Sequence, residues 1–265
     1  MTPIKVVVHG ALGKVGREVV NAVCRDPDTK LVGAIDINLK EAYLPLPDGS
    51  GKVPLSSDLD GILTAQKPDV LVDFSLAKAA MPAARTATKR RVHLVIGTTG
   101  LTPADLEEID RLAKASGTGA VVASNFALGA VVMMQLARIA AKYFDYAEII
   151  ELHHHLKADA PSGTALTTAR VMAKARGKPF LAPSDKDATM KSRGEQVEGI
   201  SLHSVRLPGL LAHQEVLFGI AGQTLSIRHD TISRECYMPG VLLAVKEVHR
   251  YQGLVNGLAP LLGLE

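Results

Sequence analysis

The densest group of reactive side chains in the sequence lies in the segment ELHHHLKADAPSGTAL, residues 151–166. Within twelve residues it holds three histidines, a lysine, an aspartate and two hydroxyl side chains, namely His153, His154, His155, Lys157, Asp159, Ser162 and Thr164. Imidazole groups exchange protons near neutral pH, and a lysine adds positive charge. The segment therefore indicates an acid–base site that faces an anionic substrate.

A zinc site is the alternative interpretation of the three adjacent histidines. In an extended segment, neighbouring side chains point to opposite faces, so all three cannot reach one ion. Their spacing also matches neither the helical H-E-x-x-H pattern nor a cysteine-rich site. We therefore expect proton transfer rather than metal binding, and no metal is assigned.

A helix is predicted directly after this cluster, over residues 165–176, and Ser162 or Thr164 is placed to cap its first turn. The free N–H groups at a helix start attract anions, and a carboxylate fits there as well as a phosphate. Capping alone explains the two hydroxyl residues. The functional interpretation adds that a ligand carboxylate shares these N–H groups.

Three glycines follow a short β-branched run near the N-terminus, in the segment VVVHGALGKVGREVV, residues 6–20. Gly10, Gly13 and Gly16 have G-x-x-G-x-x-G spacing, a variant of the G-x-G-x-x-G dinucleotide fingerprint. Such glycines allow a tight turn, close approach of the backbone to a pyrophosphate, and close packing of helix on strand. Turns also use glycine for purely local reasons, so other residues must support a nucleotide site.

Asp36 supplies that support, because it lies 20 residues after Gly16 at the end of the second predicted strand. An acidic residue there binds ribose hydroxyls, and the alternative is a solvated strand end. Its charge disfavours a 2′-phosphate, and Ile37 follows it where an arginine would favour one. Lys14 and Lys40 compensate in part. We expect NADH to be used well and leave NADPH use open.

Two later segments, Gly97–Gly100 and Ala123–Phe126, follow predicted strands at the ends where ligands bind in open α/β sheets. Their glycines and small polar side chains suit a ribose, a nicotinamide or a carboxylate. Capping of a turn explains Thr98 and Thr99 about as well as ligand binding does. Phe126 is either a core residue or a side chain that packs against a nicotinamide.

Short apolar runs alternate with helical patterns over the first half of the chain. The predicted strands are Ile4–Val8, Leu31–Ile37, Val70–Phe74, His93–Ile96 and Ala120–Ala123, and the predicted helices are Lys14–Arg25, Ala77–Arg91 and Pro103–Ser116. Residues 38–57 are rich in Gly and Pro and indicate a loop or irregular piece. This alternation predicts an α/β fold with a Rossmann-type, doubly wound parallel sheet.

The pattern changes after about residue 128. The predicted elements there are a helix at Leu128–Phe144, a strand at Ala147–Leu152, a helix at Ala165–Arg176, strands at Ile200–Arg206, Glu215–Ile220 and Gln223–Arg228, and a helix at Pro239–His249. The polar residues 179–199 suggest a mobile loop. We therefore expect a second α+β domain with a mixed or antiparallel sheet.

The composition excludes several classes of protein. With 265 residues, 47% hydrophobic and 22% charged, the chain is expected to be soluble and globular rather than disordered. A net charge of +3 and 4% aromatic residues do not indicate nucleic-acid binding. The longest apolar run, residues 126–137, is shorter than the ~20 residues that span a membrane. Two cysteines and the lack of a signal-like start lead us to expect a cytoplasmic protein.

These motifs together resemble the 4-hydroxy-tetrahydrodipicolinate reductase (dihydrodipicolinate reductase) family over nearly the whole chain. GALGKVG, the DFS at residues 73–75, GTTG and ASNF occur in the family's order. The most specific match is the family pattern E-x-H-H-x-x-K-x-D-x-P-S-G-T-A, which residues 151–165 meet at every fixed position. The segment SRECYMPGVLLAV also resembles the family's closing segment.

The resemblance implies that the enzyme reduces dihydrodipicolinate to tetrahydrodipicolinate in lysine and diaminopimelate biosynthesis, by hydride transfer from NADH or NADPH. It implies that His153 and Lys157 are the catalytic proton carriers. Which of the two delivers the proton is left open. It also implies a small dicarboxylate substrate and a homotetramer assembled through the sheets of the second domain. The substrate-binding residues that it implies are His154, Ser162, Gly163 and Thr164.

The cofactor contacts that the resemblance implies come from four segments. They are Gly10, Ala11, Leu12, Gly13, Lys14, Val15, Asp36, Gly97, Thr98, Thr99, Ala123, Ser124, Asn125 and Phe126. Residues 1–126 and 237–265 are then expected to form the dinucleotide-binding domain. Residues 127–236 are expected to form the substrate-binding and oligomerisation domain.

Many members of the family carry a basic residue after the acid of the second strand, where this chain has Ile37. That difference favours dual or NADH-leaning use of the cofactor. Two other functions stay open: another nicotinamide-dependent reductase of amino or keto acids, and a non-catalytic NAD(H)-sensing Rossmann protein. The His–Lys cluster argues against a sensor, which needs no proton donor.

Overall fold

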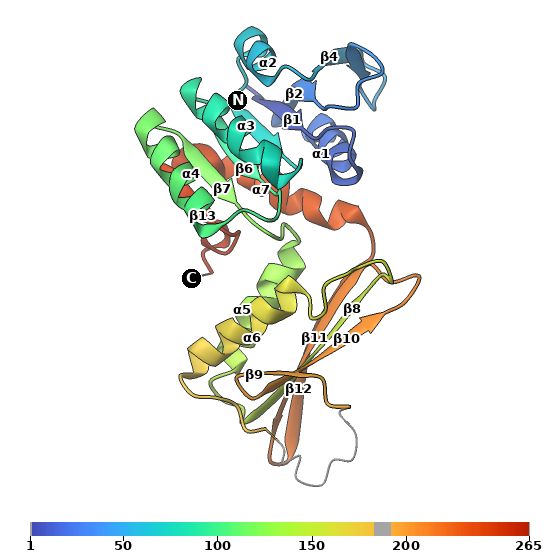
Figure 1. Ribbon diagram of the computed structural model, residues 1–265, viewed down its shortest axis with the longest axis vertical. Coiled ribbons are helices and arrows are strands. Elements are labelled where there is room, and N and C mark those ends of the chain that lie inside the picture. Colours follow the sequence, from blue (N-terminus) through green and yellow to red (C-terminus); the bar gives the residue numbers. More distant parts are fainter. Residues whose placement is uncertain (1, 183–191, 265) are drawn as a thin grey trace. The chain divides into compact units, whose positions relative to one another are not determined.

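The computed structural model describes residues 2–182 and 192–264 (Figure 1). They form two compact units. The first joins the residues up to Phe126 to those from Tyr237 onward, and the second is Ala127–Cys236. In the described ranges, no helix combines the length and the apolar character needed to cross a membrane.

The first unit is built on an eight-stranded sheet with the order β13-β7-β6-β5-β1-β2-β4-β3. All neighbours are parallel except β3 and β4. The strands are β1 (Ile4–His9), β2 (Thr29–Ile35), β3 (Tyr43–Pro45), β4 (Lys52–Ser56), β5 (Val70–Asp73), β6 (His93–Ile96), β7 (Gly119–Val122) and β13 (Gly253–Asn256). The chain turns to opposite sides of β1 when it forms β2 and β5, which makes the gap between β1 and β5 the topological switch point.

Helices cover both faces of this sheet, as the predicted doubly wound fold requires. On one face α2 (Leu59–Gln66), α3 (Ala77–Lys89) and α4 (Pro103–Ser116) pack side by side, and α1 (Lys14–Arg25) contacts α7 (Met238–Glu247) on the other. Local signals define α4 well: Thr102 and Asp105 form a capping box, Pro103 opens the helix, and Gly117 ends it in the left-handed conformation.

Three parts of the first unit differ from the sequence prediction. Helix α2 was not predicted, although Asp58 caps its first turn. Residues 38–57, predicted as irregular, contain β3 and β4, because Val53 and Leu55 alternate into the core and β4 pairs with β2. Strand β13 was not predicted. It extends the sheet beyond β7 with only two apolar residues, Leu254 and Val255, which is too short a run to show period-two alternation.

The second unit has a mixed five-stranded sheet with the order β12-β11-β8-β10-β9. Strands β8 and β10 are parallel, and the other neighbours are antiparallel. The elements are α5 (Leu128–Ala140), β8 (Tyr146–His153), α6 (Gly163–Arg176), β9 (Glu195–Val197), β10 (Ile200–Arg206), β11 (Ala212–Ile220) and β12 (Gln223–Thr231). The predicted fold class, a doubly wound parallel sheet with a second mixed sheet, is confirmed.

One face of the mixed sheet is covered by α5 and α6, which also pack on each other. Side chains alternate along each strand, so every second residue enters this core. Its largest buried members include Ile149, Met172, Leu202 and Phe218. The polar segment 179–199, predicted as a mobile loop, lies partly outside the described residues. Its described part includes β9.

Candidate active site

The glycine-rich turn connects β1 to α1 and is closed against the end of β5. Gly10 has a φ of +79°, and a Cβ built on it would lie 2.7 Å from the carbonyl oxygen of Phe74. A Cβ on Gly16 would lie 1.9 Å from the carbonyl oxygen of Gly10. Backbone therefore occupies the space of both side chains, and Gly13, the N-cap residue of α1, offers no side chain to its first N–H groups. The turn is shaped to bring backbone N–H groups close to an anion.

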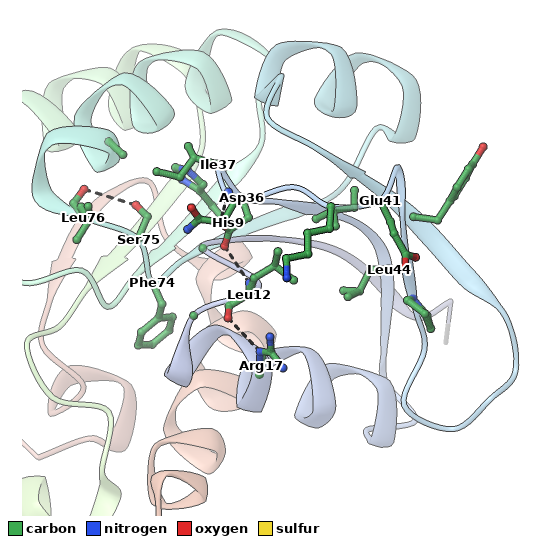
Figure 2. Close-up of a pocket in the computed structure, with 18 of the residues that line it drawn as sticks. His9, Leu12, Arg17, Asp36, Ile37, Glu41, Leu44, Phe74, Ser75 and Leu76 are labelled. Atoms are coloured by element: carbon green, nitrogen blue, oxygen red, sulfur yellow. Dashed lines mark hydrogen bonds between the residues drawn. The ribbon is translucent and has the colours of Figure 1, made fainter.

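Asp36 is tied to this turn and is not a solvated strand end. Its side chain is buried, and its Oδ2 atom accepts a hydrogen bond from the backbone N–H of Leu12 at 2.9 Å (Figure 2). Its Oδ1 atom accepts another from the backbone N–H of Asn38 at 3.0 Å. Each carboxylate oxygen keeps a second lone pair, so the group can still accept hydrogen bonds from ribose hydroxyls.

A cavity of about 740 Å³ lies at the switch point of the sheet. Four predicted cofactor residues are among those that line it: Gly10, Leu12, Gly13 and Asp36 (Figure 2). Ile37, which the sequence places beside the 2′-phosphate position, also lines it. Lining residues that were not predicted include His9, Arg17, Phe74, Ser75 and Lys78. Arg17 lies one turn into α1, and Phe74 and Ser75 directly follow β5. Ligands bind beyond the carboxyl ends of the strands in such sheets, so the position of Phe74 and Ser75 after β5 was a signal that could have identified them.

The other predicted cofactor residues are not among the residues that line this cavity. Thr98 follows β6 and is buried, and its Oγ1 atom donates a hydrogen bond to Asp73 at 2.7 Å. Phe126 is 2% exposed, with its ring centroid 5.5 Å from that of Phe74. The ring of Phe126 is therefore packed as a core side chain.

A polar network around the buried Asp73 reaches the wall of the cavity, which His9 and Ser75 line. Asp73 accepts hydrogen bonds from Thr98 and from both the hydroxyl and the backbone N–H of Ser75, and its Oδ2 atom lies 2.9 Å from Nδ1 of His9. Burial raises the pKa of Asp73, but the hydrogen bonds and charge from His9, with those from Ser75, hold it below its ordinary value. The network fixes the ends of β1, β5 and β6 relative to one another.

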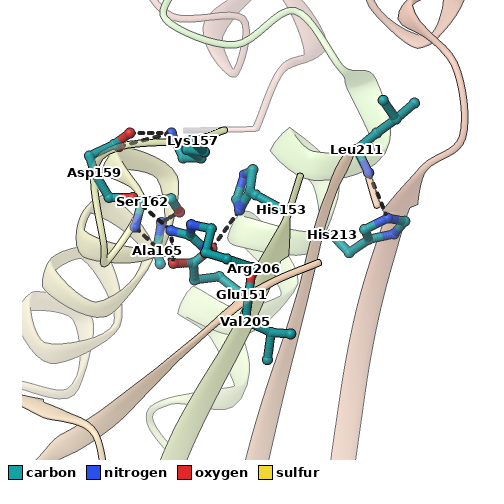
Figure 3. A network of polar contacts seen from close by, with 10 residues as sticks. All are labelled: Glu151, His153, Lys157, Asp159, Ser162, Ala165, Val205, Arg206, Leu211 and His213. Carbon is teal, nitrogen blue, oxygen red and sulfur yellow. Dashed lines mark hydrogen bonds and ion pairs between the residues drawn. The ribbon is translucent and has the colours of Figure 1, made fainter. Parts of the chain in front are cut away.

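In the second unit, the reactive cluster is assembled where β8 and β10 end side by side. In this parallel pair, His153 is the register partner of Arg206. Glu151, which is fully buried, lies between them: its Oε2 atom is 2.5 Å from Nδ1 of His153, and Arg206 donates to both of its oxygens at 2.7 and 2.9 Å (Figure 3). Glu151 and Arg206 were not among the predicted site residues.

The loop after β8 is fixed to the same pair. Lys157 forms an ion pair with Asp159 at 2.7 Å, and Arg206 donates to the carbonyl oxygen of Asp159 at 2.6 Å (Figure 3). The backbone N–H of Ser162 donates to Glu151 at 3.2 Å, and the hydroxyl of Ser162 caps α6 by accepting from the N–H of Ala165. The structure therefore gathers His153, Lys157 and the start of α6 around one buried ion pair.

The remaining predicted substrate residues lie in the same loop and helix start. His154 and Thr164 are half-buried, and Gly163 is exposed, with open space where a Cβ would lie. Within residues 2–182 and 192–264, no three His, Cys, Asp or Glu side chains are grouped as metal ligands. The cluster offers a proton-carrying imidazole, an ammonium group and a helix N-terminus, which together suit an anionic ligand that takes up a proton.

Comparison with known proteins assigns both units. The family model for the N-terminus of dihydrodipicolinate reductase matches residues 4–126, and the model for its C-terminus matches residues 129–262. A 4-hydroxy-tetrahydrodipicolinate reductase of Dehalococcoides mccartyi is 57% identical over 264 residues, 100% of both chains. That of Moorella thermoacetica is 46% identical over 98% of both chains.

A solved structure shows the same relationship. The dipicolinate-bound dihydrodipicolinate reductase from Paenisporosarcina sp. TG-14 is 38% identical, with a TM-score of 0.87 over 98% of this chain and 99% of that one. The N-terminal Rossmann unit is thus of the kind that binds a nicotinamide cofactor, and the resemblance noted from the motifs is confirmed. The chain belongs to the dihydrodipicolinate reductase family, whose members are oxidoreductases of lysine biosynthesis.

Proposed function

We propose that this chain reduces 4-hydroxy-tetrahydrodipicolinate, or the dihydrodipicolinate formed from it, to tetrahydrodipicolinate with NADH or NADPH. The observation that carries the proposal is the cluster of His153 and Lys157 around the buried Glu151–Arg206 pair, in a chain of this family. The proposed reaction belongs to lysine and diaminopimelate biosynthesis, and we propose the cytoplasm as its site.

The glycine turn and Asp36 fit a dinucleotide. The backbone cradle at Gly10 and Gly16 leaves no room for side chains, and Asp36 is fixed beside it by the N–H of Leu12. In the proposed complex, the turn and the start of α1 hold the pyrophosphate and Asp36 holds the adenosine ribose. The segments after β6 and β7 are proposed to serve the nicotinamide half, which supplies the hydride when bound.

We propose dual use of the cofactor with NADH preferred. The buried carboxylate of Asp36 repels a 2′-phosphate, and Ile37 beside it is 76% exposed and offers no positive charge. Arg17, Lys40 and Lys78 line the same cavity, so cations are available to a 2′-phosphate at some distance from the acid. NADPH is therefore disfavoured rather than excluded.

His153 and Lys157 are the proposed proton carriers. Lys157 is held by Asp159, so its ammonium group has a defined position in a loop that is otherwise exposed. A dicarboxylate adds negative charge beside it, which His154, Gly163, Thr164 and the Ser162-capped start of α6 are proposed to bind. The proton that completes the reduction of the ring then comes from one of these two side chains.

We further propose a homotetramer that assembles through the uncovered face of the mixed sheet. Side chains that alternate away from α5 and α6 include Ile150 and Leu217, which lie on the neighbouring strands β8 and β11 and are half-buried. The same face also carries ion pairs, Glu148 with His203 and Glu215 with Arg228. A sheet face with this mixture of apolar and paired charged side chains, and no helix on it among the described residues, favours another protein surface. Native mass spectrometry should give a tetramer, and Leu217→Arg should give smaller species. A monomeric wild-type chain would contradict this proposal.

A coupled assay tests the reaction itself. Dihydrodipicolinate synthase, pyruvate and aspartate semialdehyde generate the substrate in place, and the oxidation of NADH and NADPH is followed in parallel. We expect oxidation that depends on the synthase and is faster with NADH. Protein that binds NADH but oxidises neither cofactor would favour a sensor. Oxidation with other keto or amino acids alone would favour a different reductase.

A further inference from the structure

Glu151 is a charged side chain with no exposed surface in a site that otherwise opens to ligands. It lies two residues before His153 on β8. Because side chains alternate along a strand, these two residues face the same side of the sheet. The carboxylate therefore lies beside the imidazole as a consequence of the strand, with no loop conformation needed to bring them together.

The carboxylate of Glu151 is surrounded by donors. Arg206 donates two hydrogen bonds to it, the backbone N–H of Ser162 donates a third, and Nδ1 of His153 is 2.5 Å from Oε2. Burial by itself raises the pKa of Glu151, but the hydrogen bonds from His153, Arg206 and Ser204 lower it to about 2. Glu151 is therefore an anion wherever the protein is folded near neutral pH.

An ionised carboxylate has no proton to donate, so the proton in its contact with His153 is on Nδ1. In the neutral imidazole this leaves the lone pair on Nε2. The imidazole can then take up a proton only at Nε2. A single contact thus selects one tautomer and one reactive nitrogen.

We infer that Glu151 is a positioning residue, which holds His153 with its proton on Nδ1 so that Nε2 exchanges the proton with the ligand. The inference rests on the proposed function, because that assigns proton transfer to His153. Arg206 extends the arrangement: it is paired with Glu151 and also donates to the carbonyl oxygen of Asp159, whose carboxylate holds Lys157. Arg206 thus joins the ion pair to the loop that carries Lys157, whereas Glu151 itself contacts His153.

The competing interpretation is that Glu151 and Arg206 form a buried ion pair that only stabilises the fold. The two interpretations predict different effects of replacing Glu151 on stability and on kcat. A purely structural pair contributes to stability whether or not His153 is present. A positioning residue contributes to turnover only through His153, so its effect on kcat disappears once His153 has been replaced.

The wild-type protein itself provides the first test. Nitrogen NMR of histidine-labelled protein distinguishes the two neutral tautomers, and the signals of His153 are assigned by their loss in His153→Gln. We expect the proton on Nδ1. A neutral His153 with its proton on Nε2 would overturn the inference, and this result needs neither substrate nor activity.

A double-mutant cycle provides the second test. Glu151→Gln keeps the size of the side chain, and its amide can donate to Nδ1 and so stabilise the wrong tautomer. We expect kcat to fall ~10²-fold or more, as for the loss of the carboxylate that orients a catalytic histidine, with the Kd of NADH within about twofold. In the His153→Gln background, Glu151→Gln should change kcat less than about twofold.

Asp145→Asn is the matched control, because Asp145 pairs with the buried Arg176 in the same unit. It should leave kcat unchanged while it removes another carboxylate–guanidinium ion pair, one in which the arginine is the buried partner. Full activity in Glu151→Gln, or an equal loss with and without His153, would overturn the inference alone. A wild-type chain that does not reduce the synthase product would overturn the proposed function instead.

Discussion

The backbone N–H of Leu12 donates a hydrogen bond of 2.9 Å to the carboxylate of Asp36, which joins the glycine-rich turn to the end of β2. One side chain thereby shapes the turn that would hold a pyrophosphate and stands where a ribose would bind. We expect Asp36→Ala to raise the Kd of NADH roughly tenfold or more, because hydrogen bonds to a charged group are lost. The Kd of NADPH should rise less. Fluorescence titration with both cofactors measures the difference.

Asp60→Ala serves as the control for this variant, since it removes an exposed carboxylate of the same unit that pairs with Arg90. It should bind both cofactors like the wild type. If Asp36→Ala lost affinity for NADH and for NADPH equally, Asp36 would not be part of the ribose site. The role of Asp36 would then be limited to its hydrogen bond with the backbone N–H of Leu12.

The proposed proton carriers give the second prediction. His153→Gln and Lys157→Ala should each lower kcat by ~10²–10⁴, the range for loss of a positioned acid or base, while NADH binding is nearly intact. Steady-state kinetics and NADH titration on the same preparations separate the two effects. His249→Gln and Lys89→Ala, which change exposed side chains of the first unit, should behave like the wild type. If turnover were unchanged in both His153→Gln and Lys157→Ala, neither side chain would be a proton carrier.

The packing of the glycine turn gives the third prediction. In Gly16→Ala the new methyl group would lie 1.9 Å from the carbonyl oxygen of Gly10, so the turn or α1 must shift. We expect a loss of about 1–3 kcal/mol in the free energy of unfolding, as for overpacked cores, together with weaker NADH binding. In Gly13→Ala the corresponding distance is 3.1 Å, so its unfolding free energy should fall less. Denaturant titration checks the order, and an equally stable Gly16→Ala would contradict it.

Glu151 gives a prediction for stability at low pH. Its pKa is lowered from 4.5 to about 2 in the folded protein, so the unfolded chain binds the proton more readily. The contribution of Glu151, on the order of 3 kcal/mol, is therefore present above pH 4.5 and is lost as the pH falls towards 2. Between pH 5 and 3, the unfolding free energy of the wild type should fall more steeply than that of Glu151→Gln. Parallel slopes in denaturant titrations would contradict this.

Local signals in the sequence were enough to predict the elements and motifs that a short segment encodes. The helix Pro103–Ser116 carries its own caps, and the spacing of Gly10, Gly13 and Gly16 marks a turn between strand and helix wherever it occurs. The doubly wound sheet followed from the alternation of such segments. The pattern that begins at Glu151 also identified the family, because its fixed positions are contiguous in the chain.

The tertiary structure alone decided which groups meet across the sheets. Arg206 reaches Glu151 over 55 positions of sequence because β10 lies parallel to β8, and His9 meets Asp73 over 64 positions because β1 lies beside β5. Strand order and register depend on the packing of whole layers, which no short segment encodes. The same packing buried the ring of Phe126, whose residue type suits a core and a ligand equally. The sequence therefore determined which reactive groups the protein has, and the pairing of distant strands determined which of them are held together, because each contact needs both strands in register.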